Sequence, residues 1–177
     1  MNKKIIAMGV IFGLSSAASV FAASDNTITF QGEVTDQTCA VTVNGHAASP
    51  VVLLPTVSTG DFASSTTAGA TTFEVGVSGC TSDTSGDVKI STVFVGNLVT
   101  SSGNLGNTGT ASDVEIQILD TAGTVIDFTS NFNGDGDLTL TSGATSASAD
   151  YTAQYYTTGT PSAGSVTASL QYAVTYL

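Results

Sequence analysis

The most constraining feature of the sequence is a strict alternation of side chains over its last 14 residues. Every second position from Gly164 to Tyr176 carries glycine or an apolar residue, and the positions between them are mostly polar. A period of two residues is typical of a β-strand with one buried face, because successive side chains point to opposite sides. No turn signal follows this strand, so we expect an apolar strand edge that favours association with other chains.

Similar short segments, rich in Val, Ile, Thr and aromatic residues, recur along the whole chain. We expect strands at residues 25–34, 39–43, 51–57, 71–80, 88–96, 114–120, 124–128, 137–141, 152–158 and 164–176. Turn residues separate them, and we expect an acidic turn at 133–137 and a surface loop at 142–150. Many short strands at this spacing predict an all-β fold, either an antiparallel sandwich or a barrel.

The first residues have the pattern of an export signal. Lys3 and Lys4 precede an apolar run, and Val20 and Ala22 suit the −3 and −1 positions of a cleavage site, so we expect residues 1–22 to be a signal peptide. Its removal leaves 155 of the 177 residues, which is enough for one domain. No later stretch approaches the length of about 20 apolar residues that a transmembrane helix needs.

The remaining chain is strongly acidic. One lysine and no arginine stand against 14 acidic residues, which gives a net charge of −13. Nucleic acids and anionic membranes are bound through Lys and Arg, so neither is an expected partner.

Two cysteines, Cys39 and Cys80, are present. In an exported chain an even number of cysteines indicates one disulfide, and closing a loop of about forty residues contributes roughly 4 kcal/mol. Two buried free thiols are the alternative, which an oxidising compartment disfavours.

Catalytic and metal-binding chemistry has little support in the sequence. His46 is the only histidine, and it lies in a turn-like segment, so no nucleophile has an evident base. Residues 133–137 resemble the first half of a calcium loop, but Leu138 replaces the required glycine and Ala144 the required glutamate. We expect neither an enzyme nor a bound metal or other cofactor.

Several segments, taken in order, resemble one known family. The chain resembles the type 1 fimbrial major-subunit family of chaperone-usher pilins. The segments that carry the resemblance are TFQGEVTDQTC, VVLLPTVSTGDF, FEVGVSGC, VEIQILDTAGTVI, YTAQYYTTG and the terminal strand. The resemblance implies a donor-strand extension at residues 23–36 and a fimbrial domain at 37–177. It also implies an incomplete immunoglobulin-like sandwich that lacks its last strand and is completed by a strand from a neighbouring subunit.

The resemblance assigns roles to two alternating sets of residues. Those expected to enter the groove of the next subunit are Ile28, Phe30, Gly32 and Val34. Those expected to form the acceptor groove and to be recognised by a chaperone are Gly164, Val166, Ala168, Leu170, Tyr172, Val174 and Tyr176. The implied partners are identical or homologous pilin subunits, joined head to tail, a periplasmic chaperone and an outer-membrane usher. The implied location is a fimbrium on the surface of a Gram-negative cell.

Other interpretations remain open at this point. Periodicity alone is equally consistent with residues 25–34 forming an ordinary first strand paired within its own domain. A minor tip or adaptor pilin, a single-domain glycan-binding surface adhesin and an exported spore-coat-like protein are the functional alternatives. Glycan sites usually present aromatic platforms, and this chain has no Trp.

Overall fold

Eight β-strands form two antiparallel sheets in the part of the chain that the structure describes, which confirms the predicted all-β class. The computed structural model describes residues 39–48, 50–81 and 84–177. The first sheet contains, in spatial order, β1 (Ala40–Val43), β2 (Thr67–Ser78), β7 (Ser146–Thr157), β5 (Val114–Leu119) and β4 (Leu105–Gly106). The second contains β6 (Phe132–Leu140), β3 (Val88–Gly96) and β8 (Leu170–Tyr176).

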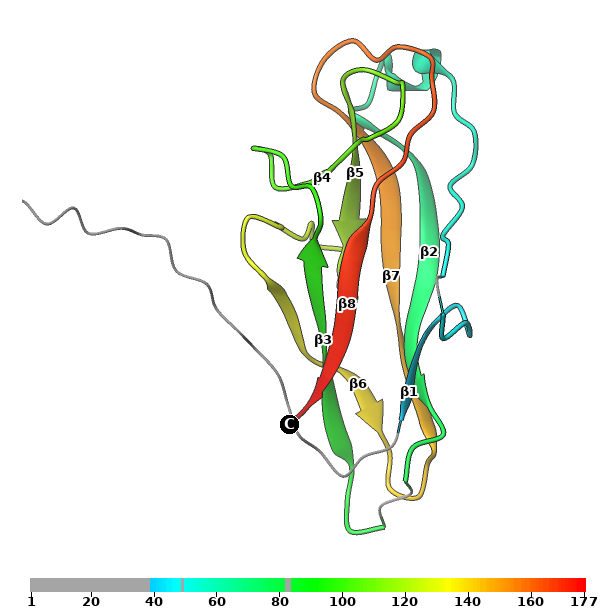
Figure 1. The fold of residues 1–177 in the computed structure, drawn as a ribbon, viewed down its shortest axis with the longest axis vertical. Coiled ribbons are helices and arrows are strands. Elements are labelled where there is room, and N and C mark those ends of the chain that lie inside the picture. The colour runs from blue at the N-terminus through cyan, green and yellow to red at the C-terminus, as the bar shows by residue number, and fades with distance from the viewer. Residues whose placement is uncertain (1–38, 49, 82–83) are drawn as a thin grey trace, which may run out of the picture. The chain divides into compact units, whose positions relative to one another are not determined.

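The two sheets pack face to face around apolar side chains from alternate strand positions. The larger cluster of buried residues includes Phe73, Val75, Phe94, Ile118 and Tyr151. A second cluster, built around Ile90, Leu138 and Leu140, contains Cys80 and contacts Val174 and Tyr176 near the end of β8. Figure 1 shows β8 beside β3, as expected from their ladder of paired residues.

One short 3-10 helix, η1 (Thr59–Phe62), interrupts the β structure. Ser58 caps it, because the Ser58 hydroxyl accepts a hydrogen bond from the Gly60 amide and the Asp61 carboxylate accepts one from the Ser58 amide. No helix in the described part of the chain is long and apolar enough to cross a membrane.

Several expected elements differ from those observed. Residues 51–57 and 124–128, both predicted as strands, belong to no strand in the structure; Val125 makes one isolated bridge to Leu119. The predicted loop at 142–150 is partly strand, because β7 begins at Ser146 and its small residues pair with β2. Small side chains favoured a loop prediction, but the ladder with β2 compensates for the area that they cannot bury.

The predicted acidic turn at 133–137 is wrong, because these residues lie inside β6, where the last three of them form a bulge. Three residues, Asp135 to Asp137, stand opposite the single residue Ser91 of β3, between the pairs Thr92 with Gly134 and Ile90 with Leu138. A bulge turns side chains away from the regular alternation of a strand. Here it directs the Asp137 carboxylate toward the space between the sheets.

Asp137 takes part in a hydrogen-bonded group that joins the two sheets. The Tyr151 hydroxyl, on β7, donates a hydrogen bond to the Asp137 carboxylate and contacts the Thr92 hydroxyl on β3. The Thr92 hydroxyl donates to Asp137 Oδ2 over 3.1 Å, and Thr121 donates to Asp137 Oδ1 over 3.2 Å. Tyr151 is 0% exposed, so these partners satisfy a hydroxyl that water does not reach.

The first prediction concerns the response of stability to alkaline pH. Burial raises the pKa of the Tyr151 hydroxyl above its ordinary value, and the hydrogen bond to Asp137 raises that pKa further. Above about pH 10 the unfolded chain therefore loses a proton that the folded chain keeps, and the free energy of unfolding should fall by up to roughly 1.4 kcal/mol per pH unit. Below that pH the contribution is fully present.

Urea unfolding between pH 8 and 11 measures this slope. Tyr151→Phe should reduce this slope more than the control Tyr156→Phe, the same change five residues further along β7. An equal slope in the wild-type chain and in Tyr151→Phe would contradict the prediction.

Candidate functional site

The second sheet ends at β8, whose outer edge pairs with no strand among the described residues. β8 pairs with β3 on its inner side, for example Tyr172 with Phe94 and Leu170 with Gly96. All six strand pairings in the structure are antiparallel. An edge strand leaves a row of amide and carbonyl groups without ladder partners, which makes it a template for a further strand.

An open groove with a volume of about 920 Å³ runs beside this edge. One wall is the segment from Val166 to Tyr172, and the other is the segment from Pro50 to Leu54. The floor is formed by core side chains of both sheets, namely Val43, Phe73, Val75, Phe94, Leu105, Ile116, Ile118, Ala153 and Tyr155. The groove therefore reaches down to the hydrophobic core of the sandwich, although its floor side chains, apart from the half-buried Tyr155, are at most 8% exposed.

The second wall has the side-chain alternation of a strand without a strand's ladder. Val52 and Leu54 pack against the larger core cluster, whereas Val51 and Leu53 are 73% and 81% exposed. Residues 50–54 belong to no strand in the structure. The pattern that predicted a strand here describes the side-chain directions correctly, but no strand of the described chain pairs with residues 50–54.

The first wall is held in place before β8 begins. The Ser165 carbonyl accepts a hydrogen bond of 3.0 Å from the Ala111 amide, and the Thr167 carbonyl accepts one of 2.8 Å from the Thr108 amide. The Thr167 amide in turn donates to Asn107 Oδ1 over 2.9 Å. These bonds fix the segment that precedes β8 without using a strand on the groove side.

The structure divides the seven residues that the sequence assigned to the terminal strand into three groups. Val166, Ala168, Leu170 and Tyr172 line the groove. Gly164 does not; it lies against the backbone of Thr110 and Ala111, so closely that a Cβ atom would overlap them. Val174 and Tyr176 lie beyond the lining and pack against the second core cluster.

The chemistry of the groove limits what can bind there. Apolar side chains predominate in its lining, the rest are uncharged Thr, Ser and Gln, and no charged residue contributes. No group of three or more His, Cys, Asp or Glu side chains suited to a metal ion occurs in the described residues. The groove therefore suits an extended, apolar segment, whose backbone can pair with the edge of β8.

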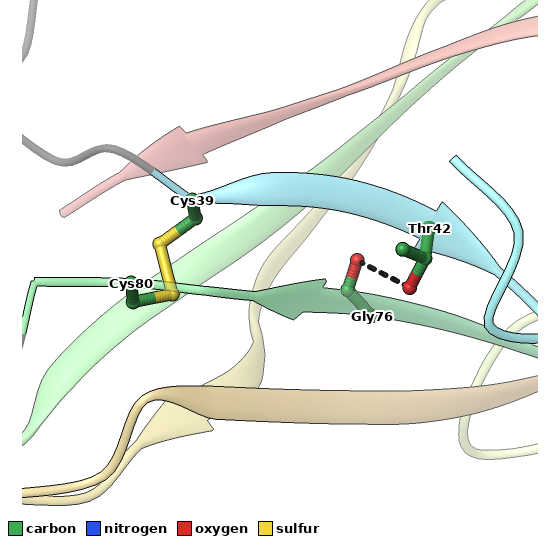
Figure 2. The surroundings of a disulfide bond; sticks show 4 residues. All are labelled: Cys39, Thr42, Gly76 and Cys80. Carbon is green, nitrogen blue, oxygen red and sulfur yellow. Dashed lines mark hydrogen bonds between the residues drawn. A yellow bond between two sulfur atoms is a disulfide. The ribbon is translucent and has the colours of Figure 1, made fainter. Parts of the chain in front are cut away.

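The predicted disulfide is present, between Cys39 and Cys80, whose Cα atoms are 4.1 Å apart. It joins the residue before β1 to the residues that follow β2, alongside the hydrogen bond from the Thr42 hydroxyl to the Gly76 carbonyl (Figure 2). Cys39 and Cys80 lie with the second core cluster, as do Val174 and Tyr176. The start of the described chain is thus covalently attached at the end of the sandwich where β8 finishes.

The residues expected to be donated lie outside the described part of the chain; they are Ile28, Phe30, Gly32 and Val34. Sequence reasoning did not assign the floor of the groove or its second wall. Phe73, Phe94 and Ile118 carried only the general signal of a buried strand face, and nothing in the sequence distinguishes a core residue under a missing strand from any other.

An antiparallel sandwich with an open groove along one edge is an arrangement to which a further strand could be added. The Fimbrial protein family matches residues 28–177, and the chain belongs to that family. It is thus a fimbrial protein, a structural class without enzymatic activity.

Curated relatives match along almost the whole chain. The F17 fimbrial protein of Escherichia coli is 36% identical, and the match covers 99% of each chain. The S-fimbrial protein subunit SfaA of Escherichia coli O6:K15:H31 (strain 536 / UPEC) is 30% identical over 99% of each chain. The major fimbrial subunit SMF-1 of Stenotrophomonas maltophilia (strain K279a) is 32% identical, over 92% of this chain and 99% of its own.

Solved structures share the fold at lower sequence identity. The P pilus rod subunit PapA has a TM-score of 0.57 at 17% identity, over 78% of this chain and 99% of its own. A chain from a solved chaperone-usher pilus has a TM-score of 0.59 at 19% identity, over 90% and 100% of the two chains. These similarities identify the two sheets as the incomplete immunoglobulin-like fold of pilin rod subunits.

Proposed function

We propose that this chain is a polymerising structural subunit of a fimbrial shaft, and that its segment Asp25–Val34 completes the sandwich of the next copy. The open groove beside β8 is the observation that carries the proposal. A periplasmic chaperone would occupy the groove first, and the donor segment of an incoming subunit would replace it at an outer-membrane usher. The assembled fimbrium would stand on the surface of a Gram-negative cell.

The donor segment matches the groove in pattern and is long enough to fill it. Ten residues of extended chain span about 33 Å, more than the roughly 20 to 23 Å of the groove-lining segment 166–172. Ile28, Phe30 and Val34 share one face of the donor, as the groove-facing residues of β8 share one face of theirs. Burial of these three side chains contributes about 1.5 to 3 kcal/mol each, and each ladder hydrogen bond adds about 1 kcal/mol.

The donor must come from another copy if it pairs antiparallel to β8, which is the orientation of all paired strands in the two sheets. Val34 would then lie near Val166, about 33 Å from the end of β8. Cys39 lies in the same core cluster as Val174 and Tyr176, at that far end. The five residues from Val34 to Cys39 reach only about 17 Å, so a chain cannot place its own donor in this orientation.

Donation to a different copy gives a head-to-tail contact. The donor segment and the groove are different surfaces of the subunit, so each added copy presents a new groove or a new donor, and growth does not close on a dimer. The similarity to a protein named as a major fimbrial subunit, SMF-1, supports the shaft rather than a minor tip or adaptor subunit. Quantitative mass spectrometry of purified fimbriae distinguishes the two, because a shaft subunit is present in many copies per fibre.

The second prediction tests the donor assignment with a matched pair of variants. Phe30→Asp places a charge on the face that enters the groove, and an unpaired charge costs several kcal/mol to bury. Gln31→Asp makes the neighbouring substitution on the opposite face. We expect wild type and Gln31→Asp to give a ladder of multimers on gels run without boiling and Phe30→Asp to give none. A normal ladder from Phe30→Asp would refute the proposal.

A further inference from the structure

Tyr151 lies directly beneath the floor of the groove without lining it. Its ring packs on Phe73, with ring centroids 5.8 Å apart, and meets Phe94 edge to face at 4.9 Å. Phe73 and Phe94 both line the groove, one from each sheet. The position of the Tyr151 ring therefore sets the position of two aromatic rings on which an inserted strand would rest.

The Tyr151 hydroxyl is held from the opposite sheet. Its partners are Thr92 on β3 and Asp137 on β6, so the hydrogen bonds cross from the central strand of one sheet to the other sheet. Thr92 pairs with Val174 of β8, two residues from the pair of Phe94 with Tyr172. Strand β3, which supplies Thr92 to the Tyr151 hydroxyl, is thus also the strand that pairs with β8, the wall of the groove.

The position of Asp137 depends on the bulge in β6 and on one glycine. Gly134 is buried, and a Cβ atom there would overlap Asp137 Oδ2 and crowd the Thr92 hydroxyl. A side chain at position 134 would therefore expel the carboxylate. Glycine is required here for the close approach, and the bulge supplies the three residues that turn Asp137 inward.

We infer that Tyr151 is a positioning residue for strand insertion: its hydroxyl, held by Thr92 and Asp137, fixes the spacing of the two sheets and the floor rings, so that the groove selects the side chains of the incoming strand. The inference rests on the proposed function. Apolar contacts are non-directional, so by themselves they do not fix the position of one sheet relative to the other. These hydrogen bonds do, because they require a defined distance and angle between donor and acceptor. The groove needs such a constraint because no strand among the described residues lies across its open side to separate its walls.

The test measures selectivity between two labelled peptides, one with the sequence Asp25–Val34 and one with Gly32→Ala added. Each is titrated into the full mature chain carrying Phe30→Asp, whose own donor is inactive. Tyr151→Phe is compared with Tyr156→Phe, a matched change on the same strand outside the groove lining. We expect the ratio of the two dissociation constants to fall by roughly fivefold in Tyr151→Phe, the equivalent of one hydrogen bond, and to stay unchanged in Tyr156→Phe.

If Tyr151 has a purely structural role, Tyr151→Phe should weaken the binding of both peptides equally, and that result would overturn the inference. A parent chain that binds the two peptides with equal affinity would overturn it as well. Should Tyr151→Phe fail to fold, Asp137→Asn keeps the shape of the carboxylate and should lower the ratio in the same direction; an unchanged ratio overturns the inference too. If the parent chain binds neither peptide, the proposed function itself fails, and the inference falls with it.

Discussion

A subunit with a blocked groove and a subunit with an inactive donor, when mixed, should form dimers and nothing longer. Ala168 lines the groove from the β8 side, so Ala168→Arg would fill the groove with a long charged side chain. That variant still carries a normal donor segment. Phe30→Asp keeps an open groove but cannot donate, and each variant alone should remain unpolymerised.

Head-to-tail assembly explains why the mixture stops at two. The donor of the Ala168→Arg subunit enters the groove of the Phe30→Asp subunit, and the product has a blocked groove and an inactive donor at its two ends. A symmetric contact between identical surfaces would not behave in this way. In a wild-type population, Ala168→Arg should shorten fimbriae in proportion to its share, which electron microscopy measures.

The control for this experiment is Ala173→Arg. Ala173 lies on β8 but points away from the groove, is exposed and contributes nothing to the lining. The substitution adds the same charge and bulk to the same strand, and fimbriae of normal length are expected. Polymers longer than the dimer in the mixture of Ala168→Arg and Phe30→Asp would contradict the assignment of the groove.

Loss of the disulfide should lower the free energy of unfolding by about 4 kcal/mol, since Cys39 and Cys80 close a loop with a sequence separation of 41 residues. That is a large share of the roughly 5 to 15 kcal/mol by which a domain of this kind is stable. The bond also attaches the chain that follows the proposed donor segment to the end of β2, so in the proposed fibre tension would pass through it into the first sheet.

Urea unfolding with the groove filled by the peptide Asp25–Val34 measures this loss in the double variant Cys39→Ala and Cys80→Ala. A reducing agent should destabilise the wild-type chain by a similar amount and leave the double variant unaffected. A loss below about 1 kcal/mol in the double variant would show that the cross-link adds little to the sandwich.

Sequence reasoning succeeded where the information is local. The strand predicted at 88–96 is β3 with the same limits, Val88–Gly96, because alternating Val, Ile and Phe residues specify a buried face directly. Residues 51–57 show the limit of that reasoning. Their alternation places Val52 and Leu54 against the core correctly, but strand formation needs a ladder partner, and the groove lies where that partner would be.

The prediction of a turn at the acidic segment 133–137 failed for a different reason. Gly and Asp residues favour turns, so a turn was the natural prediction. Asp137 instead finds its partners in Thr92 and Tyr151, 45 and 14 residues away in sequence. No local pattern reveals that a carboxylate will be needed between two sheets.

Sequence alone was thus sufficient for the all-β class, the disulfide and the family, because side-chain alternation, cysteine number and motif order are all properties of a linear chain. The family resemblance implied an acceptor groove, but only the tertiary structure could show which residues form its floor and second wall, and that Tyr151 joins the sheets beneath it. Those features arise where strands distant in sequence meet, so no local pattern in the chain marks them.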